Sequence, residues 1–358
     1  MFRRTHSPAR HRSAVGHVLL ALLLCAAPAG AEAPHDGAGF GVTDSDDYVA
    51  AAMGPLFAAL EPETFRFIVP YNAVEDRALM ARTAERIARA RAAGVRDVVV
   101  SFGARGGDAR ETGFHRPPVE EWIERVRSFM DAFDAEVDVW GPANEPNAGV
   151  GWLAGAHGDG PRLLAAYYRA LEAEVERRGG DDRLLSPEFH DEYDATGAPA
   201  RGAAEARHGP GLTNLRHYID HYTRAGGDFG DYVGWHPYAG VRRMSAASTD
   251  DLLAATPPSV PVWISEVGAI AHAPRLGVAI GPAEQDAQVR FIVRELAQRP
   301  RVTRVSYWHM IDLTPGWDSA LLDSTGAPRP AWHTWCWAAM GRCGELLRGV
   351  EPLPWRFP

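Results

Sequence analysis

Short apolar runs alternate along the chain with longer segments in which apolar residues recur at helical spacing. Residues 95–102 form one such run, and their largely apolar character is typical of a strand with both faces covered. The preceding residues, 75–93, carry the helical pattern and end before Gly94, a residue suited to the left-handed cap that closes a helix. Alternation of this kind predicts a parallel sheet covered by helices.

The same alternation is repeated eight times, without a linker or a change in composition. The predicted strands cover residues 39–42, 64–70, 95–102, 137–143, 183–188, 232–238, 260–267 and 302–311. The predicted helices cover residues 48–60, 75–93, 118–133, 161–178, 212–224, 249–255, 282–298 and 330–347. Eight units favour closure into an α/β (β/α)8 TIM barrel, formed as a single domain by residues 34–358. An open doubly wound sheet is the alternative, but its phosphate-binding glycine-rich first turn is missing from the sequence.

The first 33 residues are predicted to be a secretory signal peptide rather than part of the fold. Four arginines precede an apolar run over residues 18–27, and small residues follow at Ala29, Ala31 and Ala33. The run is too short to span a membrane, and cleavage is expected after Ala31 or Ala33. We therefore expect a secreted protein, extracellular or periplasmic, that has no membrane association once the signal is removed.

The charge balance and the residue types exclude several classes of function. The formal net charge is −9, and an acidic surface without clusters of arginine argues against a nucleic-acid partner. The sequence contains no lysine, so all 37 basic residues are arginine. A Walker A loop, a Schiff-base aldolase and a pyridoxal-phosphate enzyme each need a lysine amine and are excluded. We expect no cofactor and a monomer.

Two cysteines, Cys336 and Cys343, remain after the predicted signal peptide. Export permits a disulfide between them. On an unbroken helix their seven-residue separation corresponds to about 10 Å, which is beyond bridging distance. A helix broken at Gly341 would permit the bridge, and the sequence leaves both possibilities open.

Residues 137–147 carry the most informative chemistry. An apolar strand leads to Asn144 and Glu145, and Pro146 disfavours the helical conformation for Glu145, so we expect an extended backbone there. A capping or surface carboxylate is the simplest alternative for Glu145, and an ion pair with arginine is the alternative for Glu266. Polar residues also gather at or just past the other strand ends, namely Glu188, His236, Tyr238, Glu266 and Trp308. In a barrel these ends meet at one mouth, where active sites are built.

Glu145 and Glu266 follow the fourth and seventh predicted strands, so a barrel would place them across the mouth from each other. Paired carboxylates in a cleft can hydrolyse glycosides, because one protonates the leaving oxygen and the other attacks or stabilises the anomeric carbon. We expect the two carboxyl groups to lie about 5 Å apart, the separation of a retaining enzyme.

Three segments resemble the fourth-, sixth- and seventh-strand signatures of the clan A retaining glycoside hydrolases. They are Trp-Gly-Pro-Ala-Asn-Glu-Pro-Asn (140–147), Trp-His-Pro-Tyr (235–238) and Trp-Ile-Ser-Glu-Val-Gly (263–268). The resemblance covers essentially all of residues 34–358, in order. Val267 stands where many members of the clan have an aromatic residue, so family 39, family 5 and the small β-1,3-glucanases all remain open.

The resemblance implies a role for each candidate residue. Glu145 would be the general acid/base and Glu266 the nucleophile, with Asn144 bonding the hydroxyl next to the anomeric carbon. Arg66 would keep Glu266 ionised and depress its pKa, while Glu145 would stay protonated longer. Among the other substrate-binding residues, Tyr238 would hydrogen-bond and orient Glu266, and His236 would line the same subsite. Trp308 would form the apolar floor under the sugar. His236 and Trp308 could instead serve packing, and Arg66 an unrelated ion pair. Trp152, Tyr193 and Trp317 could be sugar-stacking platforms or ordinary loop residues.

The sequence therefore predicts a retaining β-glycosidase that acts on a poly- or oligosaccharide by double displacement. A metal-dependent barrel hydrolase would need a His-x-His on the first strand, and residues 39–43 contain no histidine. We therefore expect no metal site. A carbohydrate-binding barrel that has lost its catalysis is the alternative, and the presence of both carboxylates speaks against it.

Overall fold

The computed structural model describes residues 38–44, 55–104, 116–148, 153, 159–191, 215–311 and 316–341. By its contacts the chain divides into two units, Met1–Glu32 and Ala33–Pro358, and every described residue belongs to the second. The predicted signal peptide, residues 1–33, lies outside the described residues. Within the described part of the chain, no helix has the length and apolar character needed to cross a membrane.

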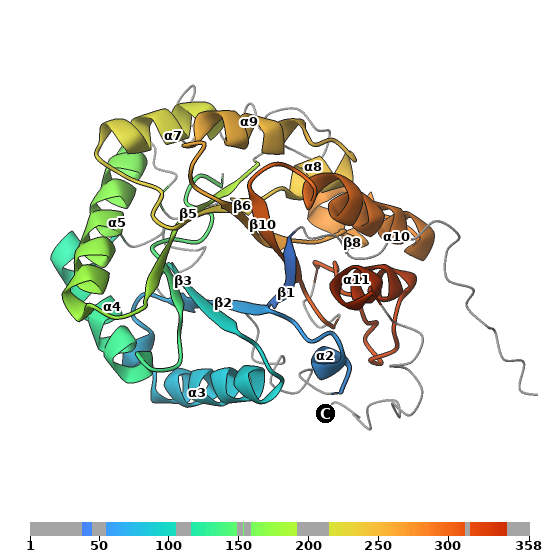
Figure 1. Ribbon diagram of the computed structural model, residues 1–358, viewed down its shortest axis with the longest axis horizontal. Coiled ribbons are helices and arrows are strands. Elements are labelled where there is room, and N and C mark those ends of the chain that lie inside the picture. The colour runs from blue at the N-terminus through green and yellow to red at the C-terminus, as the bar shows by residue number, and fades with distance from the viewer. Residues whose placement is uncertain are drawn as a thin grey trace, which may run out of the picture. The chain divides into compact units, whose positions relative to one another are not determined.

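Eight parallel strands form a closed barrel, which confirms the predicted (β/α)8 fold (Figure 1). The strands follow each other around the barrel in chain order, and the last one, β10, pairs with both β7 and β1. The barrel strands are β1 Gly39–Thr43, β2 Thr64–Pro70, β3 Asp97–Gly103, β4 Val139–Gly141, β5 Arg183–His190, β6 Tyr232–His236, β7 Val262–Val267 and β10 Val302–Trp308.

Helices flank the barrel on its outside, as Figure 1 shows. The α-helices are α2 Pro55–Ala59, α3 Arg77–Ala92, α4 Val119–Phe133, α5 Asp159–Arg178, α7 Leu215–Arg224, α8 Tyr238–Arg242, α9 Ala247–Ala255, α10 Pro282–Phe291 and α11 Pro330–Met340. A π-helical segment, η3 (Ile292–Leu296), continues α10, and two 3₁₀ turns are η1 (Ala73–Glu75) and η2 (Pro274–Leu276). Two short strands, β8 (His272–Ala273) and β9 (Val278–Ala279), form an antiparallel hairpin after β7.

Successive residues of several strands enter two different apolar clusters, because side chains alternate between the two faces of a strand. In β3, for example, Val98 and Val100 join the main cluster between strands and helices, whereas Val99 joins a smaller one. The smaller cluster draws its side chains from four barrel strands: Val99, Val139, Leu185 and Trp263. Most of the polar side chains described below lie near or beyond the carboxyl ends of the barrel strands.

Every predicted element is represented in the described residues, but several boundaries near the site differ from the prediction. Strand β4 covers only Val139–Gly141 of the predicted 137–143, β5 runs on to His190, and β10 ends at Trp308 rather than at residue 311. Tyr238 begins helix α8 instead of ending a strand, and the hairpin β8–β9 was not predicted. Most of these differences lie at the carboxyl ends of barrel strands, where the chain leaves the regular ladder.

Helix α11 ends at Met340, and Gly341 caps it with a left-handed backbone at φ 64°. The break that a disulfide would need is therefore present. Cys336 is buried and disulfide-bonded. Cys343, its partner in the prediction, lies outside the described residues.

Gly234 of β6 is required by the close approach of the neighbouring strand. A Cβ atom at this position would lie 2.6 Å from Cγ and 3.0 Å from Cα of Glu188. We expect Gly234→Ala to lower the free energy of unfolding by about 1–3 kcal/mol, because it overpacks a buried contact. Denaturant unfolding would measure this, with Gly281→Ala as the control, since no atom lies within 4 Å of the added methyl there. Equal losses in both variants would contradict the packing argument.

Candidate active site

Six of the seven predicted site residues meet in one group at the end of the barrel, linked by hydrogen bonds and ion pairs. Arg66 comes from β2, Asn144 and Glu145 follow β4, His236 ends β6, Tyr238 begins α8, and Glu266 lies in β7. All but Asn144 and Glu145 are buried, and those two are partly exposed. The seventh residue, Trp308, ends β10 and packs in an adjacent apolar cluster with Tyr238.

Glu145 does not have the extended backbone that the sequence suggested. Its φ is 43°, in the left-handed region that non-glycine residues rarely adopt. Such a conformation costs about 1–3 kcal/mol and persists where surrounding contacts dictate it. Here the side chain of Asn147 bonds both the N–H and the carbonyl of His190, at 2.8 and 2.7 Å, and so ties the turn to β5. The expectation failed because it considered Pro146 alone and not these contacts with the neighbouring strand.

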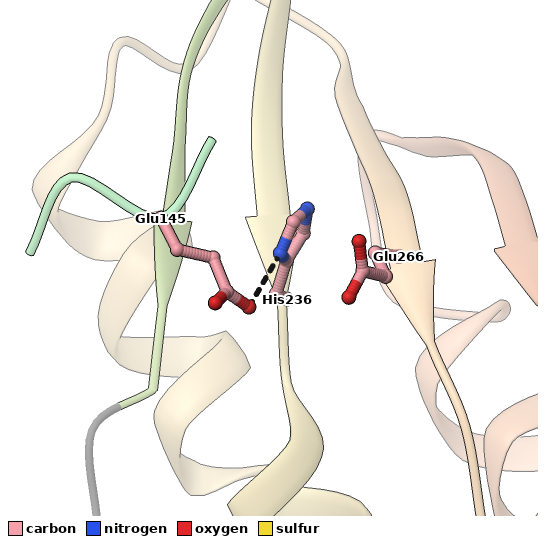
Figure 2. A group of neighbouring side chains, drawn as sticks. All are labelled: Glu145, His236 and Glu266. Atoms are coloured by element: carbon pink, nitrogen blue, oxygen red, sulfur yellow. Dashed lines mark hydrogen bonds and ion pairs between the residues drawn. The ribbon is translucent and has the colours of Figure 1, made fainter. Parts of the chain in front are cut away.

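The turn aims Glu145 at His236 and Glu266. Nδ1 of His236 and Oε1 of Glu145 lie 2.9 Å apart. Ligand atoms of Glu145, His236 and Glu266 all lie within 4.8 Å of one another. Figure 2 shows the two carboxylates on either side of the imidazole, each turned toward it. One oxygen of Glu145 and one oxygen of Glu266 therefore lie at most 4.8 Å apart.

Two donors hold the carboxylate of Glu266. Arg66 Nη1 donates to Oε2 at 2.6 Å, and the hydroxyl of Tyr238 donates to Oε1 at 2.9 Å. The second arm of the guanidinium, Nη2, donates to Oδ1 of Asn144 at 2.6 Å. Arg66 is fully buried and thus fixes the positions of Glu266 and Asn144 relative to each other.

The pKa directions are the reverse of those expected from the resemblance. Burial raises the pKa of Glu266, and although His236 and Arg66 oppose this, the negative charges of Glu145 and Glu188 reinforce it. Burial would also raise the pKa of Glu145, but the charge of His190 and the hydrogen bond with His236 lower it to about 2. The expectation counted only Arg66 and omitted the histidines and the additional carboxylate.

His236 is the cation that explains this reversal. Burial disfavours its charge, but the surrounding carboxylates of Glu266, Glu145 and Glu188 raise its pKa to about 9. The imidazolium donates from Nδ1 to Glu145 and from Nε2 to Oγ of Ser265, at 3.1 Å. At neutral pH the proton shared by this pair therefore resides on His236.

This proton gives stability a defined pH dependence. The pKa of His236 in the folded protein, about 9, lies above the 6.5 of an ordinary histidine. The protonated imidazole therefore contributes fully to the free energy of unfolding below about pH 6.5, and this contribution is lost as the pH rises through 9. We expect the free energy of unfolding of wild type to be higher than that of His236→Gln by on the order of 1–3 kcal/mol near pH 6. The difference should shrink toward pH 10. Urea unfolding of both proteins across this range would measure it. A pH-independent difference would show that His236 is neutral in the folded protein.

Two residues of the site received no role from the sequence, although the first was noted among the polar strand ends. Glu188 of β5 is fully buried, with Oε2 2.5 Å from Arg66 Nη2 and Oε1 3.6 Å from His236 Nε2. His190 ends the same strand, and its Nε2 lies 3.9 Å from Oε1 of Glu145. The signal for Glu188 was a carboxylate within a strand whose other residues are mostly apolar.

Two of the candidate sugar-stacking aromatic residues pack beside Tyr238, which bonds Glu266. Trp308 and Trp317 pack against the buried cluster of Tyr238, Ile270, Ala273 and Val278, which includes the β8–β9 hairpin. Trp317 meets Tyr238 edge to face, with ring centroids 5.5 Å apart. The other two candidate platforms, Trp152 and Tyr193, lie outside the described residues.

The same three residues, Glu145, His236 and Glu266, are the group within the described chain that could hold a metal ion. The fit is poor. Arg66 already places a cation against Glu266, and both nitrogens of His236 face hydrogen-bond partners within the protein. A protonated imidazole cannot ligate a metal.

No protein-family model and no curated protein sequence matches the chain. Solved structures do. GH5_18 from Streptomyces cattleya, in complex with GlcNAc, matches with a TM-score of 0.59 and 17% identity, over 84% of this chain and 79% of that one. The β-glycosidase BGL167 matches with a TM-score of 0.61 and 14% identity, over 83% of this chain and 87% of that one. A β-glucosidase from Exiguobacterium marinum matches with a TM-score of 0.60 and 13% identity, over 85% of this chain and 97% of that one. The likeness shows the fold.

Proposed function

We propose that the protein is a secreted, retaining β-glycoside hydrolase, with Glu145 as general acid/base and Glu266 as nucleophile. The observation that carries the proposal is the pair of carboxylates, with oxygens within 4.8 Å of each other. Retaining glycosidases hold their two carboxyl groups about 5–5.5 Å apart, whereas inverting enzymes need about 6.5–9.5 Å to admit a water molecule. The glycosidase names of the matched structures support the same class of reaction.

In the first step, an oxygen of Glu266 attacks the anomeric carbon as the bond to the leaving oxygen breaks. The leaving oxygen takes a proton from Glu145. In the second step, water attacks the anomeric carbon, its proton goes to Glu145, and the bond to Glu266 breaks. The hydrogen bonds from Arg66 and Tyr238 orient Glu266 for attack, and they stabilise its carboxylate when it leaves.

The proton for the first step is supplied within the site. In the substrate-free protein it resides on Nδ1 of His236, 2.9 Å from Glu145. A bound sugar excludes water and thereby raises the pKa of the carboxyl, so the proton moves along this hydrogen bond to Glu145 before it reaches the leaving oxygen. Loss of that proton from His236 should then set the alkaline limb of the activity profile.

Hydrolysis of a panel of aryl β-glycosides and β-linked polysaccharides tests the proposal, with the first-formed anomer followed by proton NMR. We expect the β-anomer to appear first and the α-anomer to grow in later by mutarotation. An initial α-anomer would overturn the retaining mechanism. A protein that binds glycans but cleaves none would favour the carbohydrate-binding alternative.

A further inference from the structure

Glu188 occupies a position that the proposed mechanism does not use. It lies in β5 with no exposed surface, and its backbone N–H donates to the carbonyl of Ala143 at 3.1 Å. A parallel bridge pairs it with Asn144, so it stands level with the turn that carries Glu145. Gly234 leaves the space for its side chain, because a Cβ atom on that glycine would overlap Cγ of Glu188. The segment after β4 and strand β6 therefore enclose Glu188, and its side chain has no exposed surface that could meet a sugar.

The two oxygens of Glu188 face the two cations of the site. Oε2 accepts from Arg66 Nη2, and Oε1 lies 3.6 Å from Nε2 of His236 without a hydrogen-bond partner of its own. Arg66 in turn holds Glu266, and His236 holds Glu145. Glu188 is thus linked to each predicted catalytic carboxylate through one intermediate residue: through Arg66 to Glu266 and through His236 to Glu145.

We propose that Glu188 is a positioning residue of the active site, which fixes Arg66 and His236 and through them sets the protonation of Glu266 and Glu145. The inference rests on the proposed function. It assigns the third carboxylate a role that neither donates to nor attacks the substrate.

The charges at the site explain why a third carboxylate is useful. In the substrate-free protein Arg66 and His236 are both cations and both fully buried. Burying a charge without a partner is costly, and an ionised Glu188 places an anionic oxygen 2.5 Å from Arg66 and 3.6 Å from His236. Burial would raise the pKa of Glu188, but the charges of Arg66 and His236 lower it well below its usual range. Among the described residues, His236 is faced by the carboxylates of Glu145, Glu188 and Glu266 and by the hydroxyl of Ser265. Three further titratable groups contact those carboxylates: His190 lies near Glu145, and Arg66 and Tyr238 bond Glu266.

An ordinary structural ion pair is the competing explanation, and Glu174 provides its control. Glu174 is also a buried glutamate with arginine partners, since Arg127, Arg177 and Arg178 surround it. It lies in α5, on the outer helices, away from the site. Glu174→Gln therefore removes a comparable buried charge without touching the proposed machinery.

The test compares wild type, Glu188→Gln and Glu174→Gln by imidazole NMR and by the pH dependence of kcat/KM. Removing an anion next to His236 should lower its pKa by about 1–3 units and move the alkaline limb by the same amount. kcat should fall about 10- to 100-fold with KM little changed, as for outer residues that orient catalytic groups. Glu174→Gln should leave the His236 titration and the activity profile unchanged. An unshifted His236 titration in Glu188→Gln, or the same shift in both variants, would overturn the proposal.

The NMR measurement needs no substrate, so it tests the link between Glu188 and His236 even if the protein hydrolyses no glycoside. A lack of hydrolysis would overturn the proposed function, whereas an unshifted His236 titration would overturn the role of Glu188. Should Glu188→Gln not fold, wild type labelled with ¹³C at the glutamate carboxyls provides the answer. The Glu188 resonance should stay that of an ionised carboxylate between about pH 4 and 9. A Glu188 carboxyl that titrates within this range would overturn the proposal.

Discussion

Glu266→Ala is expected to lower kcat on the order of 10⁵-fold while the protein stays folded. The substitution removes the proposed nucleophile and leaves room where its carboxylate stood. Arg66 keeps its contacts with Glu188 and Asn144, so no buried cation is left unpaired. Azide can then enter the vacant space and attack the anomeric carbon from the face that Glu266 occupied. The product should be the α-glycosyl azide, with inverted configuration.

The measurement is hydrolysis of an activated aryl β-glycoside with and without azide, with the product identified by NMR. Glu295→Ala is the matched control, because this glutamate side chain is 54% exposed and its contact with Arg299 is 4.0 Å long. The control should keep wild-type activity, since exposed pairs contribute little. Activity that survives in Glu266→Ala would show that the nucleophile has been misassigned.

The fold could be predicted because its pattern is local and repeated. Both faces of each parallel strand are covered, so a strand such as β2 appears as a largely apolar run, and its predicted bounds were those observed. Glycines with a left-handed backbone, such as Gly94 at φ 87°, marked the ends of several helices. Closure of the barrel followed from the number of units and the lack of a boundary between them.

The turns at the strand ends could not be predicted, because contacts distant in sequence decide them. The conformation of Glu145 depends on Asn147 bonding to His190, which lies 43 residues away. Tyr238 begins a helix, yet its hydroxyl still reaches Glu266 as the resemblance implied. The residue types at the mouth were therefore predicted, whereas the backbone that carries them was not.

The electrostatics of the site were the least predictable part. A pKa depends on every charge within a few ångströms, and the sequence identified Arg66 while giving no role to Glu188 or His190. With those groups in place, the proton that the proposed mechanism needs is held on His236 rather than on Glu145. A motif specifies which residues meet, but it does not specify which of them is charged.

Replacing Glu145 by alanine should produce a loss that depends on the leaving group. A leaving group that is a poor acid, such as a second sugar, needs full protonation as its bond breaks, so hydrolysis should fall on the order of 10²- to 10⁴-fold. An activated aryl group departs without that proton, so its release should slow far less. The second step should then limit turnover, because no base assists the attacking water.

Azide distinguishes this variant from Glu266→Ala. As an anion it needs no general base, so it should attack the glycosyl-enzyme at Glu266 and give the β-glycosyl azide, with retained configuration. The measurement is kcat and kcat/KM for a series of aryl β-glycosides of graded leaving-group acidity, with Glu295→Ala again as the control. If the loss is the same for every leaving group, Glu145 does not donate the proton. The two variants should therefore give azides of opposite configuration, which no purely structural role for either carboxylate can produce.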